Sequence, residues 1–331
     1  MKRMKLAACF VLALGLAACQ GGNPFSESKR THTPVYVYRN PIKPVMDDQL
    51  PQFANYPDGR TKLGLLGPVQ SVTCMGFPII DISFNEQGNI TYTCSSLDEA
   101  RRFSERNTFV YDESGRLQDI RDEAGSTHPA FVYDADGRLI SEGQGRYKSD
   151  YTYHANGKLR KARGHEFDEE GRLVRRSGYT QNIYVCDAKN DYNTLRSEST
   201  FSYTDGLCTL QEETLYYHYY DVEKTLSGRH EYAYNSRGDL IQWNYSGAVY
   251  ARKDSEDPFT TGSYTLRFDY EYDDQGNWTT MRVYLPANFS SVRWLQQSHA
   301  IYNKLNPVAQ NAASPIFEIR RSIDYYLSID K

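Results

Sequence analysis

The chain repeats one seven-residue pattern: an aromatic residue, three variable residues, glycine, one variable residue and an apolar residue. Seven copies occupy residues 84–90, 111–117, 133–139, 153–159, 167–173, 234–240 and 272–278, and a shortened eighth copy occupies residues 203–207. Repetition of this kind indicates that one supersecondary unit is stacked many times along the chain. The repeat therefore constrains the fold more strongly than the overall composition does.

Each copy has the residues of a tight β-hairpin. In residues 111–117, Asp112 and Gly115 stand at the first and fourth positions of a type I turn, and the glycine supplies the positive φ of a G1 bulge. This geometry pairs Tyr111 with Leu117 across the two strands. The turn glycines predicted in this way are Gly88, Gly115, Gly137, Gly157, Gly171, Gly238 and Gly276.

Because successive side chains of a strand point to opposite faces, the Tyr/Leu pairs share one face and the Asp/Arg pairs share the other. A second aromatic residue two positions earlier, as in Phe109/Tyr111, extends the first face into a row of rings. Cross-strand aromatic pairs contribute about 0.2–1 kcal/mol each, and exposed ion pairs contribute about 0–1 kcal/mol. The 28 tyrosines also bring hydroxyl groups that need polar partners.

The pattern predicts an all-β protein in which tandem antiparallel hairpins form one long, twisted and curled sheet, either spiral or partly closed. Two strands per repeat give roughly sixteen strands, and open twisted sheets rarely exceed about ten without curling. We expect a single domain over residues 35–331. Its parts are an amino-terminal cap at residues 35–68, the hairpin repeats at residues 69–285 and a carboxy-terminal cap at residues 286–331.

The first 18 residues have the charged start and apolar run of a signal peptide. Leu16-Ala17-Ala18-Cys19 resembles the bacterial lipobox, which implies cleavage before Cys19, lipidation of this cysteine and a flexible membrane tether at residues 19–34. Gln20 rather than Asp follows the cysteine, and the resemblance to sorted lipoproteins then implies the outer membrane where the organism has one, with the protein facing the periplasm or the cell surface. The alternative is an ordinary secretion signal with an incidental cysteine.

The remaining chain is mildly acidic. Removal of the signal peptide leaves 35 basic residues against 42 acidic ones, a formal charge of −7. Without a basic surface there is no counterion-release contribution to nucleic-acid affinity, so no nucleic-acid partner is expected.

Four cysteines remain for an oxidising compartment: Cys74, Cys94, Cys186 and Cys208. They allow three pairings, of which the local one, Cys74 with Cys94 and Cys186 with Cys208, is favoured. Strands one full repeat apart lie about 9.6 Å from each other, beyond disulfide reach, so irregular backbone would have to bring each pair together. A metal site is disfavoured because the chain has neither CxxC nor a His-Cys cluster.

No nucleophile elbow, zinc-binding, phosphate-binding or calcium-binding motif is present, so we predict no catalytic residue, no cofactor and no metal. Asp168, Glu169 and Glu170 are interpreted as solvated turn residues, and His154 and His218 as strand residues. Aromatic side chains that can stack on sugars or anchor a protein partner are the candidate ligand contacts, although strand packing explains them better: Tyr217, Tyr219, Trp243 and Tyr245.

Residues 133–139, Tyr-Asp-Ala-Asp-Gly-Arg-Leu, resemble the YD repeats of the RHS family, and residues 272–278 resemble a variant found in lipoproteins of that kind. Residues 153–159 are also similar to the related MORN-variant repeats. The resemblance implies a spiral sheet that contacts carbohydrate or protein. Large RHS proteins cleave themselves at an Asp-Pro-x-Gly site beside a toxin domain, but Asp257-Pro258 is followed here by Phe-Thr, and toxin delivery is not expected.

These observations favour a non-catalytic, lipid-anchored scaffold of the cell envelope that binds an envelope glycan or a protein partner. One alternative is a periplasmic immunity or antitoxin lipoprotein that neutralises a toxin. Another is an envelope glycan hydrolase with an unrecognised site.

Overall fold

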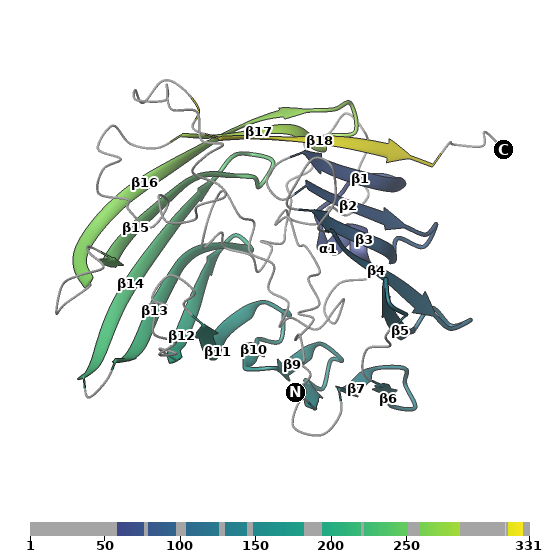
Figure 1. The fold of residues 1–331 in the computed structure, drawn as a ribbon, viewed down its shortest axis with the longest axis horizontal. Coiled ribbons are helices and arrows are strands. Elements are labelled where there is room, and N and C mark those ends of the chain that lie inside the picture. The colour runs from purple at the N-terminus through teal and green to yellow at the C-terminus, as the bar shows by residue number, and fades with distance from the viewer. Residues whose placement is uncertain are drawn as a thin grey trace.

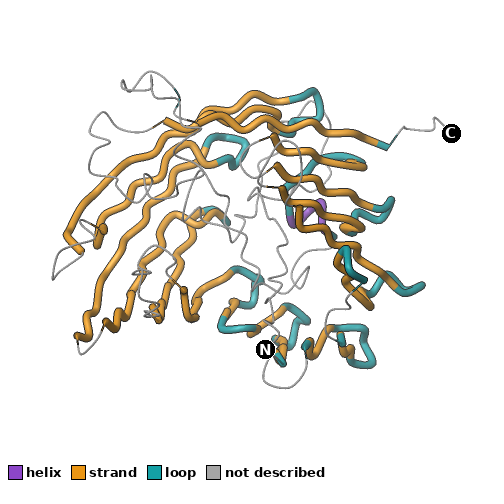
Figure 2. Tube along the Cα trace, in the orientation of Figure 1, coloured by secondary structure: helices purple, strands orange, loops and turns teal. Residues whose placement is uncertain are grey.

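A computed structural model describes residues 58–75, 79–96, 104–125, 130–143, 148–181, 194–219, 222–250, 259–284, 315 and 317–326. Within these residues the protein is all-β, with eighteen strands and one short helix (Figures 1 and 2). The helix is α1 (Gly59–Lys62). The first nine strands are β1 (Val69–Met75), β2 (Ile79–Phe84), β3 (Ile90–Ser96), β4 (Ser104–Tyr111), β5 (Leu117–Asp122), β6 (Phe131–Tyr133), β7 (Leu139–Glu142), β8 (Ser149–Tyr153) and β9 (Leu159–Ala162). The others are β10 (His165–Phe167), β11 (Leu173–Gln181), β12 (Thr194–Thr204), β13 (Leu207–Tyr219), β14 (Val222–Tyr234), β15 (Leu240–Tyr250), β16 (Phe259–Tyr272), β17 (Trp278–Tyr284) and β18 (Phe317–Tyr325).

The strands form one sheet in which almost every strand pairs antiparallel with its neighbours in sequence. Strand β18 is the exception, because it lies between β17 and β1 and so joins the last hairpin to the first strand. Among the described residues, only the step from β5 to β6 lacks a hydrogen-bonded ladder. The prediction of a curled, partly closed sheet is confirmed: the strands make a nearly closed ring with a seam between β5 and β6 (Figure 1).

The hairpin turns have the geometry that the repeat predicts. Tyr111 lies opposite Leu117, and a one-residue shift in register follows at once, as a bulge requires. The Gly115 N–H donates to the Asp112 carbonyl over 2.9 Å, and the Asp112 N–H donates to the Arg116 carbonyl over 2.9 Å. The same pair of bonds recurs in the turns at 134–138, 154–158, 168–172, 235–239 and 273–277.

The inner face of the sheet carries a large apolar core. The repeat pattern predicted only cross-strand pairs on this face and did not predict the extent of the core. Trp243, Phe268 and Trp278 are almost completely buried, as are Leu159 and Leu173 from the short-stranded side of the ring. Burial of an aromatic or aliphatic side chain of this size contributes about 1.5–3 kcal/mol. The core therefore contributes more per residue than the cross-strand pairs alone.

Residues 58–66 connect the first hairpin turn to the last one. The N–H groups of Gly59 and Arg60 donate to the Gly88 carbonyl over 3.0 and 3.1 Å. At the other end, the Leu66 N–H donates to Asn277 Oδ1 and the Leu66 carbonyl accepts from Asn277 Nδ2, both over 2.8 Å. Together with β18, this segment holds the two ends of the repeat array next to each other.

The predicted disulfide between Cys74 and Cys94 is wrong, since both are free, buried thiols. Cys74 of β1 faces Ile80 of β2, and Cys94 of β3 faces Asp81 of the same strand. Because β2 lies between them, the two cysteines are two strand spacings apart, about 9.6 Å. The regular ladder excludes the irregular backbone that this bond would have needed.

The other predicted disulfide pairs Cys208 with Cys186, and Cys186 lies outside the described residues. Residues 1–57 also lie outside them, so the signal peptide, Cys19, the tether and most of the amino-terminal cap are not part of the structural description. Within the described part of the chain, no helix has the length and apolar character needed to cross a membrane.

Candidate functional site

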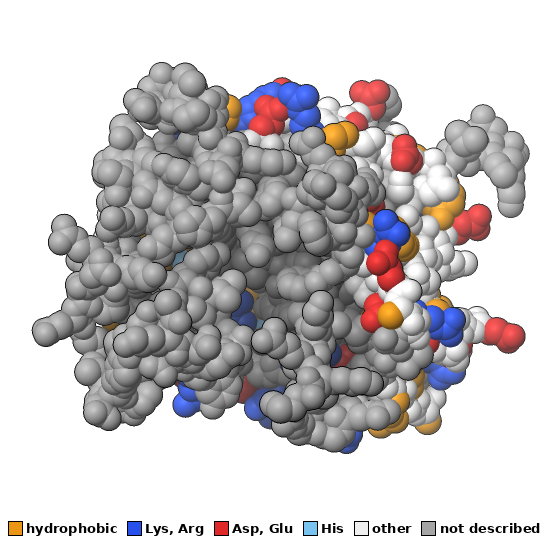
Figure 3. Space-filling view, viewed as in Figure 1, with side chains coloured by type: hydrophobic (Ala, Val, Ile, Leu, Met, Phe, Trp, Pro, Cys, Tyr) orange, Lys and Arg blue, Asp and Glu red, His pale blue; other side chains and the backbone are white. Residues whose placement is uncertain are grey.

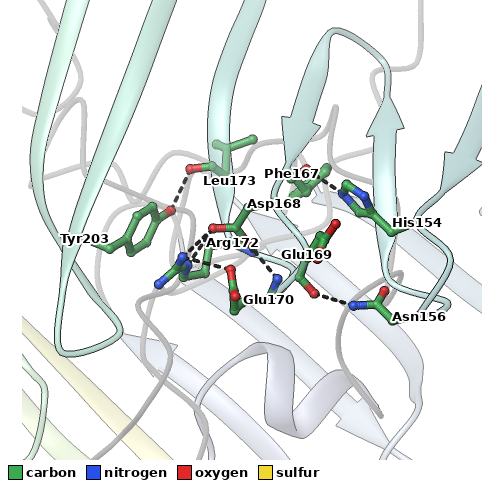
Figure 4. A network of polar contacts seen from close by, with 9 residues as sticks. All are labelled: His154, Asn156, Phe167, Asp168, Glu169, Glu170, Arg172, Leu173 and Tyr203. Carbon is green, nitrogen blue, oxygen red and sulfur yellow. Dashed lines mark hydrogen bonds and ion pairs between the residues drawn. The ribbon is translucent and has the colours of Figure 1, made fainter.

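In three turns, at Asp112, Asp134 and Asp168, the aspartate organises its own turn and holds an arginine that reaches the next hairpin. Figure 4 shows the turn at Asp168. Asp168 Oδ1 accepts from the N–H groups of Glu170 and Arg172 over 3.1 and 2.8 Å, and Oδ2 accepts from Arg172 Nε over 2.7 Å. The Arg172 guanidinium lies 5.3 Å from the centre of the Tyr203 ring, within cation–π range. The Tyr203 hydroxyl donates to the Leu173 carbonyl over 2.8 Å.

The same contacts link other neighbouring hairpins. Arg116 lies over the Tyr133 ring, whose hydroxyl donates to the Leu117 carbonyl over 2.7 Å. Arg138, Tyr153 and Leu139 repeat the arrangement. We call this set of contacts the hairpin junction. It gives the tyrosine hydroxyls backbone partners, which the repeat alone does not reveal.

The electrostatics of the junction are those of a structural contact. The backbone N–H of Arg138 lowers the pKa of Asp134, and the Arg138 side chain lowers it further. Burial raises the pKa of Tyr133 to about 12, so its hydroxyl stays protonated and continues to donate. The acids at 168–170 have the same place in their turn, with Glu169 and Glu170 exposed. His154, which replaces the turn aspartate of its repeat, has Nε2 2.9 Å from the Phe167 carbonyl.

The seven turn glycines all have positive φ, between 79° and 90°. Gly115 is open, because no atom would lie within 4 Å of an added Cβ, whereas at Gly88 an added Cβ would lie 2.6 Å from Arg60 Nε. Backbone conformation therefore explains the glycine in most turns, and close approach of residues 58–60 adds a second reason at Gly88.

Two of the candidate ligand contacts, Trp243 and Tyr245, lie on the inner face of β15 and are buried. Trp243 Nε1 donates to His230 Nδ1 over 3.1 Å, and the Tyr245 hydroxyl donates to the Ala248 carbonyl over 2.6 Å. The rings of Tyr245 and Tyr264 stack with their centres 4.9 Å apart. The Trp243 and Tyr245 side chains therefore pack in the core. Tyr217 and Tyr219 lie on β13, and their side chains fall outside the structural description.

Sequence reasoning missed the polar groups beside these rings. His230 is buried, and its Nε2 lies 3.7 Å from Glu213 Oε2. Burial raises the pKa of Tyr245 and Tyr264, and the charge of Glu213 raises both further. The sequence did hold a signal for this arrangement, because residues alternate along 229–232 and 242–246. The alternation places His230 on the inner face with the aromatic residues and the other polar residues on the outer face.

The opposite, outward face of the same strands holds a shallow pocket of about 360 Å³. Its lining comes from β14, β15 and β16. Six of the lining residues alternate to the outer face, namely Arg229, Glu231, Asn244, Ser246, Ser263 and Thr265, and the other two are Tyr245 and Tyr264 of the inner face. Elsewhere on the outer face, acidic and basic side chains lie side by side, as along β17 and β18 in Figure 3, where Arg282 bonds Glu318 over 2.8 Å. The pocket is thus a concave, hydrogen-bonding surface supported from behind by stacked rings.

The described residues contain no group of three or more His, Cys, Asp or Glu side chains placed to hold a metal ion. The arrangement of the pocket suits reversible hydrogen bonding to a polar ligand.

Fold and junctions together define a curled, nearly closed β-hairpin-repeat protein. No protein-family model matches the chain, and no curated protein matches it. Among solved structures, it is similar to the TcdB2-TccC3-Cdc42 chain, with 17% identity and a TM-score of 0.31 over 64% of this chain and 11% of the other. The chain is also similar to the Tc holotoxin pore of Photorhabdus luminescens, with 16% identity and a TM-score of 0.30 over 72% of this chain and 13% of the other. A third similar structure is a porin-like protein of Bacteroides uniformis, with 11% identity and a TM-score of 0.34 over 78% of this chain and 99% of the other.

This chain therefore spans about a tenth of the length of the TcdB2-TccC3-Cdc42 chain. The TM-scores are too low for these likenesses to carry an argument about fold or function.

Proposed function

We propose that the protein is a non-catalytic, lipid-anchored scaffold of the cell envelope that binds a glycan or a protein partner through the outer face of its sheet. We further propose kinship with the YD-repeat lipoproteins, on the basis of the repeat pattern and its junctions. In this proposal the signal peptide is removed, Cys19 carries the lipid and the sheet projects from the outer membrane.

The pocket on β14–β16 is the observation that carries the proposal. Binding sites are concave and combine a few well-placed polar groups with a rigid support. Here the outer side chains of three long strands supply the polar groups, and the stacked rings of Tyr245 and Tyr264 support the strands from behind. The acidic clusters of the turns are used within the junctions, which supports a scaffold more than a hydrolase.

The anchor is tested by mass spectrometry of the mature amino terminus. We expect a peptide that begins at Cys19 and carries diacylglycerol and an acyl chain, and we expect Cys19→Ala to release the protein from the membrane fraction. An unmodified amino terminus at another residue would contradict the lipid-anchored part of the proposal.

Binding is tested by chemical cross-linking in intact envelopes, followed by purification of the protein and identification of attached glycans and proteins. The scaffold proposal expects at least one envelope component to be recovered with the wild type and lost when the pocket is filled. Recovery of a single toxin at one-to-one stoichiometry would instead favour the immunity alternative. Release of new sugar reducing ends by the purified protein would contradict the non-catalytic proposal.

A further inference from the structure

The pocket on the outer face is built as a regular grid. Strand register places Arg229 opposite Ser246 and Ser246 opposite Ser263. In the next row of outward-facing residues, Glu231 of β14 lies opposite Asn244 of β15, and Asn244 lies opposite Thr265 of β16. Adjacent strands are about 4.8 Å apart, and alternate residues of one strand are about 6.8 Å apart. Six polar side chains therefore stand at fixed intervals on one surface.

The hydrogen bonds inside the grid leave donors available. Asn244 Oδ1 accepts from Thr265 Oγ1 over 2.8 Å and from Gln242 Nε2 over 3.0 Å. Its Nδ2 group makes no hydrogen bond to the described protein, although Asn244 is partly buried. Ser246 and Ser263 add exposed hydroxyls, which can both donate and accept.

Arg229 and Glu231 line the charged end of the pocket, and Glu212 beside the lining adds a second carboxylate there. Arg229 donates to Glu231 over 2.9 Å and to Glu212 of β13 over 3.3 Å, so one guanidinium is shared by two carboxylates. Among the described residues of these strands, Arg267 is a further cation, one row away over the Tyr284 ring. An anionic ligand would meet this negative excess, whereas a cationic or neutral one would not.

The strands beneath the grid are held rigidly. An added Cβ at Gly228 would lie 3.1 Å from the Tyr245 ring, so the ring lies directly against the inner side of the sheet there. Tyr245 in turn stacks on Tyr264. A pocket whose polar groups are already positioned loses little freedom when a ligand binds.

We infer that this pocket binds an amino sugar, either free or at the end of a glycan, an inference that rests on the proposed function and names its ligand class. The sugar hydroxyls match the mixed donors and acceptors of Asn244, Ser246 and Ser263, and the amino group matches the Glu231 carboxylate. The polar lining disfavours apolar ligands, and the carboxylate excess disfavours acidic sugars.

The test is isothermal titration calorimetry of the purified full chain with three oligosaccharide probes of equal length. They are a glucosamine oligomer, an N-acetylglucosamine oligomer and a hexuronic acid oligomer. We expect affinity to fall in that order, with about a tenfold difference between the first and the last, as expected for one charge-assisted hydrogen bond. Equal or tighter binding of the hexuronic acid oligomer would overturn the inference.

Two variants locate the site. Ser246→Trp fills the pocket and should reduce glucosamine binding at least about tenfold. The matched control, Ser202→Trp, places the same ring at an exposed position of β12 outside the pocket and should bind like the wild type. Glu231→Gln should weaken the glucosamine oligomer more than its N-acetylated form. Circular dichroism confirms that each variant is folded.

The outcomes separate this inference from the broader proposal. If none of the probes binds while envelope cross-linking still recovers a partner, the amino-sugar inference is wrong and the scaffold proposal stands. If Ser246→Trp binds the probes as well as Ser202→Trp does, the pocket is not the site. If the probes bind as expected but the envelope yields no partner, the ligand class stands and the scaffold role is contradicted.

Discussion

Asn277 offers the sharpest test of how the ring is held closed. Its side chain is fully buried and makes three hydrogen bonds of 2.8 Å: one from the Leu66 N–H, one to the Leu66 carbonyl and one to the Tyr325 hydroxyl. Asn277→Ala removes all three and leaves both backbone groups of Leu66 without these partners. An unsatisfied buried polar group costs about 1–3 kcal/mol, and Leu66 is only partly buried, so we expect a loss of about 2–4 kcal/mol.

A loss of this size is a large fraction of the stability of a domain, typically about 5–15 kcal/mol. Urea unfolding followed by tryptophan fluorescence measures it, because Trp243 and Trp278 are fully buried. The matched control is Asn156→Ala, which removes two exposed bonds, one of 2.7 Å to the Glu169 carbonyl and one of 3.0 Å from the Lys158 N–H, whose groups water can satisfy. That control should lose less than about 1 kcal/mol.

Hydrogen exchange provides the local measurement. The Leu66 amide should exchange faster in Asn277→Ala and at the wild-type rate in Asn156→Ala. If the two variants lose the same free energy of unfolding, or if the Leu66 amide keeps its protection without Asn277, the closure reasoning is refuted.

Three further results are expected. Gly164→Ala should lower the free energy of unfolding by about 2–4 kcal/mol, since the φ of Gly164 is 80° and the added Cβ would collide with the Ser177 carbonyl. At the open Gly115 the same change should lower it by only about 1–2 kcal/mol. Equal losses of the two variants in urea unfolding would contradict this reasoning. The lowered pKa of Asp134 contributes stability that is present above the unfolded pKa of about 3.9 and is lost as pH falls through the folded value. The protection of the amides in this turn, measured relative to their intrinsic exchange rates, should therefore fall in acid, and Asp134→Asn should abolish that dependence. Burial raises the pKa of the Cys74 thiol to about 12, so iodoacetamide at pH 8 should modify this thiol only after the protein is unfolded. No reductant should be needed, and modification that requires a reductant would support the predicted disulfide instead.

The repeat pattern predicted the parts of the fold that are local in sequence. The turn around Gly115 and the pairing of Tyr111 with Leu117 follow from residues a few positions apart. The curling of the sheet follows from the number of repeats. The closure could not be predicted, because Leu66 and Asn277 are separated by 211 positions and nothing local indicates their contact. Asn277 stands where several other copies of the repeat have Arg, and only the structure gives the reason for the difference.

The candidate site shows the same limit. The aromatic residues Trp243 and Tyr245 were visible in the sequence, but strand alternation puts them in the core and brings Asn244 and Ser246 to the outer surface. The other half of the pocket, Ser263 and Thr265, depends on the register between β15 and β16. A long connection separates these strands in sequence, so the register cannot be read from either strand alone.

The seam between β5 and β6 has a consequence for how such chains change length over evolutionary time. At this step the described residues contact each other through the Arg116–Tyr133 ring contact and the Tyr133 hydroxyl bond to the Leu117 carbonyl, with no ladder between the described strands. Gain or loss of a whole hairpin here would leave every other pairing in place and would alter only the circumference. The seam is therefore the point at which a gene duplication can be accommodated with the least disruption.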